Sequence, residues 1–268
     1  MPIHPTAVVD PRARLHPSVE VGPLAVIDGD VVLGEGCRVG PHVHITGCTT
    51  IGARNVFSTG AVIGGAPQDI RFSGAPTRLR IGDENVFREH VTVHCSNKIE
   101  EDTVIGSRNM LMAHCHVGHN CHLGDHVIIA NGALLGGHVL LQDRSFISGN
   151  CLVHQFVRVG ILALMQGGSA ISKDLPPYCI ARGDNGICGL NVIGLRRAGL
   201  GADVRLELRK LYRMLFRGGD SWRSALDAAA AEVRSEWGQR LVDFVRSTRR
   251  GVVMPHRGLR VEDEEEAE

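Results

Sequence analysis

The chain has 268 residues, and its 29 Lys and Arg residues balance its 29 Asp and Glu residues. With scarce aromatic residues and no dense basic run, this composition argues against a nucleic-acid partner. The chain does not begin with a basic region followed by an apolar one, so we expect no signal peptide. No apolar run approaches the ~18 residues of a membrane span, so we expect no integral membrane segment. Eight cysteines without a secretory signal do not suggest a disulfide framework, and we expect a cytoplasmic location.

A period of six residues dominates the first part of the chain. Every sixth residue from Ile3 to Ile171 has a large apolar side chain, with interruptions at Asp69 and Ala75. Helices repeat every 3.6 residues and strands every 2, so neither gives a strict period of six. The pattern is the hexapeptide repeat of a parallel β-helix. In proteins with this repeat, three hexads close a triangular coil of about eighteen residues, usually left-handed, which predicts about nine coils here.

Glycine often follows the large apolar residue, as at Gly22, Gly118 and Gly136. Glycine adopts φ > 0 without a steric penalty. We therefore expect these glycines to provide the corners with a positive φ.

The chain changes character after Pro176-Pro177. Residues 203–217 and 221–237 have helical spacing, and a third short helix is expected around 239–249. These segments predict a helical region after the repeat.

The predicted fold is mainly β, a left-handed parallel β-helix followed by a small α-helical C-terminal domain. The β-helix takes residues 1–180, with a protruding loop at about 64–80, and the helical domain takes residues 181–255. Residues 256–268 are rich in Glu and Asp and are predicted to form a disordered acidic tail.

The stretch HCHVGHNCHLGDH, residues 114–126, resembles a metal site because it holds five histidines and two cysteines. The period of six argues against that interpretation. Cys115, Cys121 and Cys151 share the phase of Cys37, a small inward position, and are expected to pack in the core as small apolar residues. A metal site at this stretch would therefore lack its sulfur ligands.

Several histidines have the outward phase instead. Positions one coil apart along the sequence should lie side by side on one edge of the prism. The resulting strip comprises His116, His119, Gly137, His138, His154 and Gln155. Each histidine alone is compatible with an ordinary surface position, but their alignment over three coils indicates a functional site.

Six stretches carry a resemblance to a known family. They are GGAPQDIRFSGAPTRLRIGDENVFRE, HVGHNC, GGHV, VHQF, DLPPY and GLNVIGLRRAG, and they follow one another in this order. The chain resembles the acyl-ACP:UDP-N-acetylglucosamine O-acyltransferases, which begin lipid A synthesis. The resemblance covers nearly the whole chain. It implies a homotrimer with active sites in clefts between neighbouring β-helices, and no metal or other cofactor.

The resemblance also implies a reaction, the transfer of an (R)-3-hydroxyacyl group from acyl carrier protein to the glucosamine 3-hydroxyl of UDP-N-acetylglucosamine. His119 matches the catalytic base, and Gly137 matches the backbone N–H that faces the developing oxyanion. The implied substrate-binding positions are Asp69, Arg71, His116, His138, His154, Gln155, Asn191 and Arg197. Gly167 matches the position that limits the depth of the acyl chain, and a glycine there favours a long chain.

The docking partner implied by the resemblance, acyl carrier protein, is strongly acidic. A basic face on the helical domain would suit it. The candidate residues are Arg196, Arg197, Arg205, Arg209, Lys210, Arg213 and Arg217. An ordinary solvated helix face is the alternative interpretation.

Three departures from the family pattern bear on function. Asn120 stands where Asp often follows the catalytic histidine, Cys95 lies in HCSN where the family usually has HRGT, and Ile193 replaces an expected Glu. An amine needs less help from a base than a hydroxyl does, so a 3-amino UDP-sugar is an alternative acceptor that would suit Asn120. A non-catalytic protein that binds UDP-sugar or acyl groups is a second alternative.

A metal-dependent carbonic anhydrase of the left-handed β-helix type is a third alternative. His114 and His119 have its H-x4-H spacing, but the position expected for the third histidine is Arg78.

Overall fold

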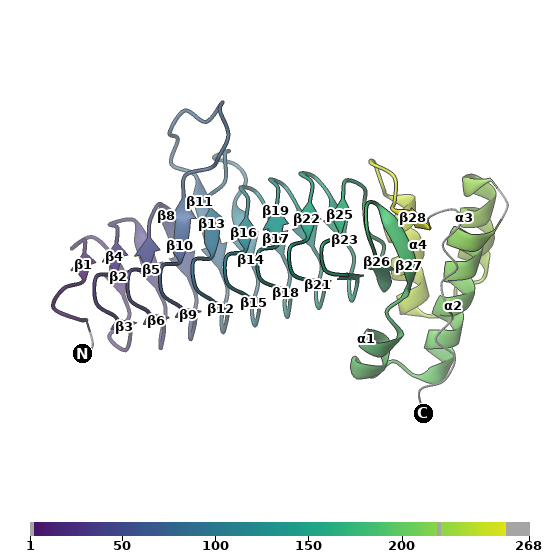
Figure 1. Ribbon diagram of the computed structural model, residues 1–268, viewed down its shortest axis with the longest axis horizontal. Coiled ribbons are helices and arrows are strands. Elements are labelled where there is room, and N and C mark those ends of the chain that lie inside the picture. Colours follow the sequence, from purple (N-terminus) through teal and green to yellow (C-terminus); the bar gives the residue numbers. More distant parts are fainter. Residues whose placement is uncertain (1–2, 219–220, 256–268) are drawn as a thin grey trace.

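The computed structural model describes residues 3–218 and 221–255. A stack of triangular coils forms a long prism, and helices pack against its carboxyl-terminal end (Figure 1). Parallel strands one coil apart pair to form the three walls of this prism. The prediction of a left-handed parallel β-helix followed by helices is confirmed.

The first wall is a nine-stranded sheet, in agreement with the nine coils that the period predicts. In order, its strands are β1 (Val8–Val9), β4 (Val26–Ile27), β7 (His44–Ile45), β10 (Val62–Gly65), β13 (Thr92–His94), β16 (His116–Val117), β19 (Leu134–Leu135), β22 (Leu152–Val153) and β25 (Ala170–Ile171).

The second wall is an eight-stranded sheet. In order, its strands are β2 (Arg14–Leu15), β5 (Val31–Leu33), β8 (Cys48–Ile51), β11 (Arg78–Ile81), β14 (Thr103–Ile105), β17 (His122–Leu123), β20 (Leu140–Leu141) and β23 (Arg158–Val159).

The third wall is an 11-stranded sheet that continues into the carboxyl-terminal region. Its strands are β3 (Glu20–Val21), β6 (Arg38–Val39), β9 (Val56–Phe57), β12 (Val86–Phe87), β15 (Met110–Leu111), β18 (Ile128–Ile129), β21 (Phe146–Ile147), β24 (Leu164–Met165), β26 (Cys179–Ala181), β27 (Gly186–Leu190) and β28 (Met254–Pro255).

The interior of the prism is mainly apolar, as the six-residue period requires. The cysteines predicted to face inward, Cys37, Cys115, Cys121 and Cys151, have no exposed surface. Burial raises the pKa of each thiol, for Cys115 and Cys121 to about 12, because a low dielectric disfavours the thiolate. These sulfur atoms are core atoms, as predicted.

Two insertions interrupt the coils, and the sequence pattern revealed only the first of them. Ile63 pairs with Val93, thirty residues later, whereas Ile27 pairs with Ile45, eighteen later. Residues 66–77 account for these twelve extra residues and form the protruding loop between β10 and β11 (Figure 1).

The second insertion adds six residues to the next coil, between β13 and β14. Ile81 pairs with Ile105, twenty-four residues later. Ile99, which the period places inside, lies in this insertion and is 49% exposed, so that prediction is wrong. Both insertions are multiples of six, so the apolar phase resumes unchanged after each.

The glycines that follow the apolar residues do not have a positive φ, contrary to expectation. Positive φ values occur two residues further on, for example at Asn120 (57°) and His138 (59°). The glycines are needed because consecutive coils approach closely. A Cβ on Gly118 would lie 2.9 Å from the carbonyl carbon of Gly136, which is shorter than a normal contact.

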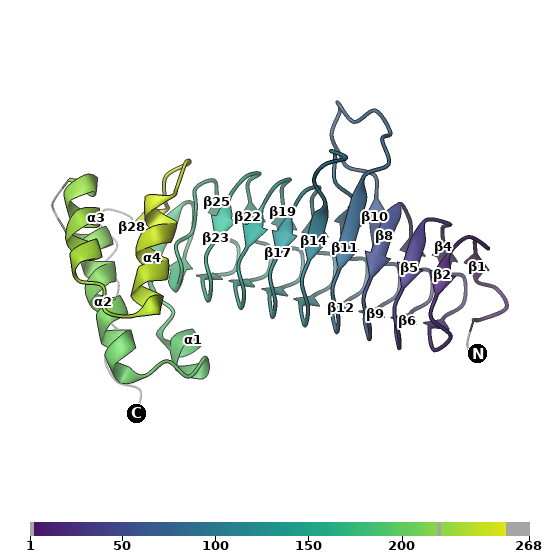
Figure 2. The ribbon, with the colours of Figure 1, turned by 180° about the vertical axis from the view of Figure 1, so that it is seen from behind.

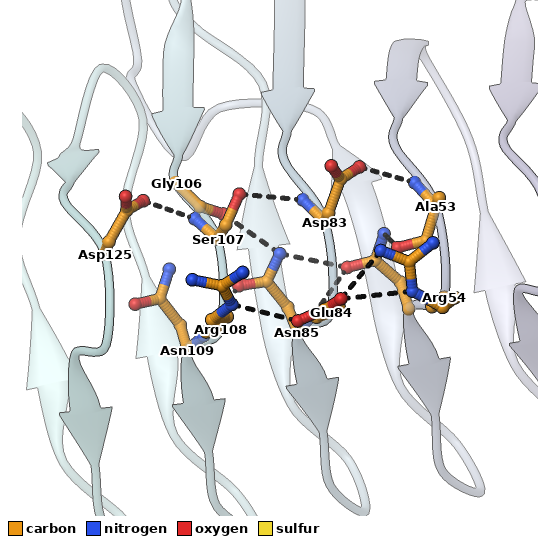
Figure 3. A network of polar contacts seen from close by, with 11 residues as sticks. Ala53, Arg54, Asp83, Glu84, Asn85, Gly106, Ser107, Arg108, Asn109 and Asp125 are labelled. Carbon is orange, nitrogen blue, oxygen red and sulfur yellow. Dashed lines mark hydrogen bonds and ion pairs between the residues drawn. The ribbon is translucent and has the colours of Figure 1, made fainter.

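Buried asparagines stack in consecutive coils at the corner between the second and third walls (Figure 3). The Asn85 N–H donates to Asn55 Oδ1 at 2.9 Å, and the Asn109 N–H donates to Asn85 Oδ1 at 2.9 Å. Outside the same corner, Glu84 bridges one arginine on each side. The amide ladder satisfies corner N–H groups that would otherwise be buried without a partner.

The carboxyl-terminal region holds four helices within the described residues. They are α1 (Val192–Arg197), α2 (Ala202–Arg217), α3 (Trp222–Ala231) and α4 (Glu236–Arg246). None of them is long and apolar enough to cross a membrane. The tail predicted for residues 256–268 lies outside the described residues.

The helix expected over 221–237 is α3, which already ends at Ala231, and the separate helix expected around 239–249 is α4, which begins at Glu236. Ser235 caps α4 by accepting a hydrogen bond from the Gly238 N–H at 3.1 Å. The carboxylate of Glu207, on α2, accepts hydrogen bonds from the N–H groups of Arg234 and Ser235. These contacts separate the helices, and helical spacing alone gives no sign of them.

A buried ion pair joins the last coils to the helical region. Asp174 is 1% exposed, and its Oδ2 accepts a hydrogen bond from Arg158 Nε at 2.8 Å. Arg158 also donates to the carbonyl oxygen of Phe244, and its guanidinium lies 4.4 Å from the centre of the Phe244 ring. Thr248, after α4, donates to the same carboxylate oxygen at 2.9 Å. We call these four residues the Asp174 clamp.

Candidate active site

The corner between the first and second walls carries both insertions and the predicted histidine strip. The rings of His119 and His138 meet edge to face, with their centres 5.2 Å apart. His138 in turn stacks on Phe156, one coil further, at 4.5 Å. The predicted alignment of His119 with His138 is confirmed. Phe156 is half exposed and was not predicted, although it ends the VHQF motif.

Gly137 leaves room for the imidazole of His119. A Cβ at Gly137 would lie 2.6 Å from Cε1 and 2.7 Å from Nε2 of His119, far inside van der Waals contact. The ring therefore lies against the backbone of the next coil, and only glycine permits this.

Replacing Gly137 by alanine is expected to displace the His119 ring and to lower kcat about 10- to 100-fold, because small misplacements of catalytic groups are costly. The fold should persist, because Gly137 does not have a positive φ. Steady-state kinetics together with circular dichroism check both statements. Gly149→Ala is the matched control, because a Cβ there meets only the Asn131 carbonyl oxygen at 3.4 Å. Equal losses in both variants would contradict the role assigned to Gly137.

Asn120 fixes the tautomer of His119. Nδ1 of His119 lies 2.8 Å from Asn120 Oδ1, which also accepts the Asn97 N–H at 3.0 Å. Nδ2 of Asn120 donates to Ser96 Oγ at 2.7 Å and to Glu101 Oε2 at 3.0 Å. A carboxylate only accepts, so the amide nitrogen faces Glu101 and the amide oxygen faces His119. His119 consequently carries its proton on Nδ1 and has a lone pair on Nε2.

Glu101 is a site residue that the sequence did not reveal, because it lies in the undetected insertion. Its side chain is 46% exposed and pairs with Lys98 at 3.0 Å. The hydrogen bond and charge of Lys98 hold the pKa of the Glu101 carboxyl below its ordinary value. The same carboxylate lies 3.8 Å from His138 Nδ1. It therefore places a negative charge beside the His138 imidazole and, through the Asn120 amide, one hydrogen-bonded group away from His119.

Three further histidines of this corner favour the neutral form. Burial lowers the pKa of His94 to about 4, and burial also lowers the pKa of His116 and of His138, with the neighbouring His119 as the next cause for both. Desolvation disfavours the imidazolium in each case.

Asp69 is anchored at the base of the protruding loop. Its carboxylate accepts the Arg71 N–H at 2.9 Å and Asn97 Nδ2 at 2.8 Å. These hydrogen bonds, first that of Arg71, lower the pKa of Asp69 to about 2. Asn97 thus ties the loop to the second insertion and, through its N–H, to Asn120. The guanidinium of Arg71 is largely exposed.

Two other predicted residues, His154 and Gln155, lie one coil beyond Gly137. Nδ1 of His154 is 3.1 Å from the Gln155 carbonyl oxygen and 3.4 Å from Arg250 Nη2. Arg250 follows α4, so the carboxyl-terminal segment reaches this edge of the strip. Sequence spacing gave no indication of that contact.

The remaining predicted positions lie elsewhere in the chain. Asn191 caps α1, because its Oδ1 accepts the Gly194 N–H and its Nδ2 donates to the Leu162 carbonyl oxygen, both at 2.9 Å. Arg197 is exposed at the end of α1. The helix α1 lies on the side of the prism away from the protruding loop (Figures 1 and 2). Gly167 precedes a corner between the third and first walls, not the corner of His119. A single chain therefore does not bring these three together with the histidine strip.

The arrangement offers no metal-binding set. Among residues 3–218 and 221–255, no group of three or more His, Cys, Asp and Glu side chains is placed to hold an ion. The carbonic anhydrase alternative required a third histidine at Arg78, whose guanidinium instead pairs with Asp102 at 2.7 Å.

Two family models match this chain. A model of bacterial transferase hexapeptide repeats covers residues 102–137, and a model described as UDP N-acetylglucosamine O-acyltransferase, domain 2, covers residues 174–253. A curated relative from Syntrophobacter fumaroxidans, named acyl-[acyl-carrier-protein]--UDP-N-acetylglucosamine O-acyltransferase, is 44% identical over 257 residues, which cover 94% of this chain and 100% of the relative. The chain belongs to the UDP-N-acetylglucosamine O-acyltransferase family.

Solved structures of the UDP-N-acetylglucosamine O-acyltransferase family agree with this assignment. LpxA from Acinetobacter baumannii superposes with a TM-score of 0.90 at 35% identity, covering 94% of this chain and 99% of that one. The Francisella novicida UDP-N-acetylglucosamine acyltransferase superposes with a TM-score of 0.91 at 32% identity, covering 96% and 95%. The resemblance seen in the sequence is confirmed, and the carbonic anhydrase alternative is set aside.

Proposed function

We propose that this protein transfers an (R)-3-hydroxyacyl group from acyl carrier protein to the glucosamine 3-hydroxyl of UDP-N-acetylglucosamine, the first step of lipid A synthesis. The observation that carries the proposal is the geometry of His119. Its Nδ1 is tied to Asn120, and its ring lies against the backbone of Gly137. Family membership supplies the substrate classes, because the curated relatives are named for them.

In this proposal His119 is the general base. Nε2 takes the proton of the sugar hydroxyl as the oxygen attacks the thioester carbon, and the resulting imidazolium returns a proton to the departing thiolate. Imidazole suits both steps because it titrates near neutral pH. The Gly137 N–H has no hydrogen-bond partner within the described residues and is available to the developing oxyanion.

We further propose that the complete site lies between two copies of the chain, as in a homotrimer. His119, His138 and Asp69 share one corner, whereas Asn191, Arg197 and Gly167 lie away from it. Residues from both groups contact the same substrate only if the His119 corner of one prism packs against a different corner of its neighbour. Their separation within one chain supports the trimer that the resemblance implies.

A basic face on α2 is the proposed docking surface for acyl carrier protein. Arg209, Arg213 and Arg217 are exposed along this helix. Lys210 is less available, because it pairs with Glu232 at 2.6 Å. Separated positive charges suit a strongly acidic partner and mainly raise its association rate.

The reaction is expected to take place in the cytoplasm. All eight cysteines are free thiols, which is compatible with a reducing compartment.

Product analysis tests the proposed reaction. The purified protein is incubated with a mixture of (R)-3-hydroxyacyl carrier proteins and UDP-N-acetylglucosamine, and the products are identified by mass spectrometry. We expect a monoacylated UDP-sugar with an ester at the 3-position, and a preference for long acyl chains because of Gly167. No acylated product from any donor would contradict the proposed function.

A 3-amino UDP-sugar is the second candidate acceptor, favoured by the amide of Asn120 beside His119. An amine is a stronger nucleophile and depends less on the base. A competition between UDP-N-acetylglucosamine and its 3-amino analogue decides between them. A clear preference for the hydroxyl sugar ends this alternative.

A further inference from the structure

We propose that Glu101 is a positioning residue of the catalytic base, acting on His119 through the amide of Asn120. The inference rests on the proposed function, in which His119 removes a proton. It answers a question raised by the sequence, because Asn120 stands where a carboxylate would orient the ring and stabilise the imidazolium. In this proposal the imidazolium is stabilised by the carboxylate of Glu101, which lies one hydrogen bond further from the ring than Asn120 does.

The contacts form a continuous chain of three groups. Glu101 Oε2 accepts from Asn120 Nδ2 at 3.0 Å, and Asn120 Oδ1 accepts from His119 Nδ1 at 2.8 Å. Ser96 Oγ and the Asn97 N–H hold the two ends of the amide in the same orientation. The amide is 4% exposed, so water competes little for these bonds.

The effect on the base is electrostatic. A carboxylate that accepts from one end of an amide polarises it and makes the oxygen at the other end a better acceptor. The His119 Nδ1–H donates to that oxygen, and it donates more strongly when the ring is protonated. The Glu101 charge therefore favours the imidazolium that forms as the sugar hydroxyl is deprotonated, without direct contact between the two side chains.

Other titratable groups also lie near His119, and a test has to separate them from Glu101. The imidazoles of His94, His116 and His138 interact with His119, and the charges of Lys98 and Asp69 act on the neighbouring His138. The Lys98 ammonium pairs with Glu101 and opposes its effect on the ring.

Glu101→Gln removes the charge while its side-chain oxygen still accepts from Asn120. We expect kcat to fall about tenfold, and the acidic limb of the kcat/KM profile to move to lower pH by up to about one unit, because one pKa unit corresponds to a tenfold change in equilibrium. KM for the UDP-sugar should change little. Glu100→Gln, which removes the neighbouring exposed charge in the same loop, should leave rate and profile unchanged. Equal effects of the two variants would overturn the proposal.

A double-variant cycle separates positioning from a structural role. Asn120→Asp places a carboxylate directly on His119 Nδ1 and should make Glu101 dispensable. In that background Glu101→Gln is expected to cost nothing, or to raise the rate by removing repulsion between two carboxylates. If Glu101 only held the loop, its loss would have the same effect in both backgrounds, and the proposal would be wrong.

Histidine NMR provides a readout that does not need turnover. With ¹³Cε1-labelled histidine, the His119 signal is identified by its absence in His119→Gln, and its titration is followed in the wild type and in both Glu variants. The midpoint should move to lower pH in Glu101→Gln alone. An unchanged midpoint defeats this inference. Absence of acyl transfer in the wild type defeats the proposed function instead and leaves the titration informative.

Discussion

Replacing His119 by alanine is expected to lower kcat about 10²- to 10⁴-fold, the usual contribution of a positioned general base. The loss should fall on kcat and not on binding, because the ring acts on the proton that moves in the transition state. The vacated space borders Gly137 at the surface of the prism, so no core contact is lost. Acylation rates and calorimetric binding of the UDP-sugar measure the two effects separately.

The control for His119 is His122→Ala, an exposed histidine on β17 of the second wall. It removes the same side chain outside the candidate site, so turnover should stay within about twofold. Unchanged turnover in His119→Ala would contradict the assignment of the base. The experiment also decides the non-catalytic alternative, because a protein that only binds UDP-sugar or acyl groups has no turnover to lose.

The second large effect is expected at the Asp174 clamp. Asp174→Ala leaves the Arg158 guanidinium partly buried without its partner, and it also removes the acceptor of the Arg158 N–H at 2.9 Å. Breaking a buried ion pair from one side costs about 3–5 kcal/mol. At about 2–4 °C per kcal/mol for a chain of this size, Tm should fall by about 6–20 °C. Differential scanning calorimetry at a fixed protein concentration checks this value.

Asp227→Ala is the matched control for the clamp, because Asp227 is an exposed carboxylate on α3. Its Tm should change by no more than about 2 °C, in keeping with surface substitutions. A similar, small shift for Asp174→Ala would show that the helical region is held to the coils by its apolar contacts alone. Leu208, Leu211 and Leu241 are buried in that region and would then account for the packing.

The histidine strip was predictable because coil stacking is a rule of register. Once three hexads close a coil, His119, Gly137 and Gln155 must lie one above another, whatever the surrounding residues are. The inward position of Cys115 and Cys121 follows from the same rule. That position alone argues against a metal site at residues 114–126, because it removes the sulfur ligands.

Other parts of the site could not be predicted, for identifiable physical reasons. Glu101 and Asn97 lie in an insertion of six residues, which leaves the apolar phase intact and is therefore invisible to a periodicity argument. The need for a glycine at position 137, which leaves room for the His119 ring, depends on the rotamer of that ring. The residues at which α3 ends and α4 begins depend on Glu207, a residue of another helix.

The sequence by itself determined the β-helix, the inward thiols and the outward strip of histidines. All three follow from one repeated spacing, because the stacking of coils brings residues that are one repeat apart in sequence next to each other in space. Only the tertiary structure decided how the base is held. The hydrogen bonds among Glu101, Asn120 and His119 join an insertion to a coil, and the separation of these residues in sequence does not follow from the six-residue period. The tertiary structure also placed the predicted site residues on separate parts of one chain. The three corners of a coil are equivalent in the repeat, but they point in different directions in space.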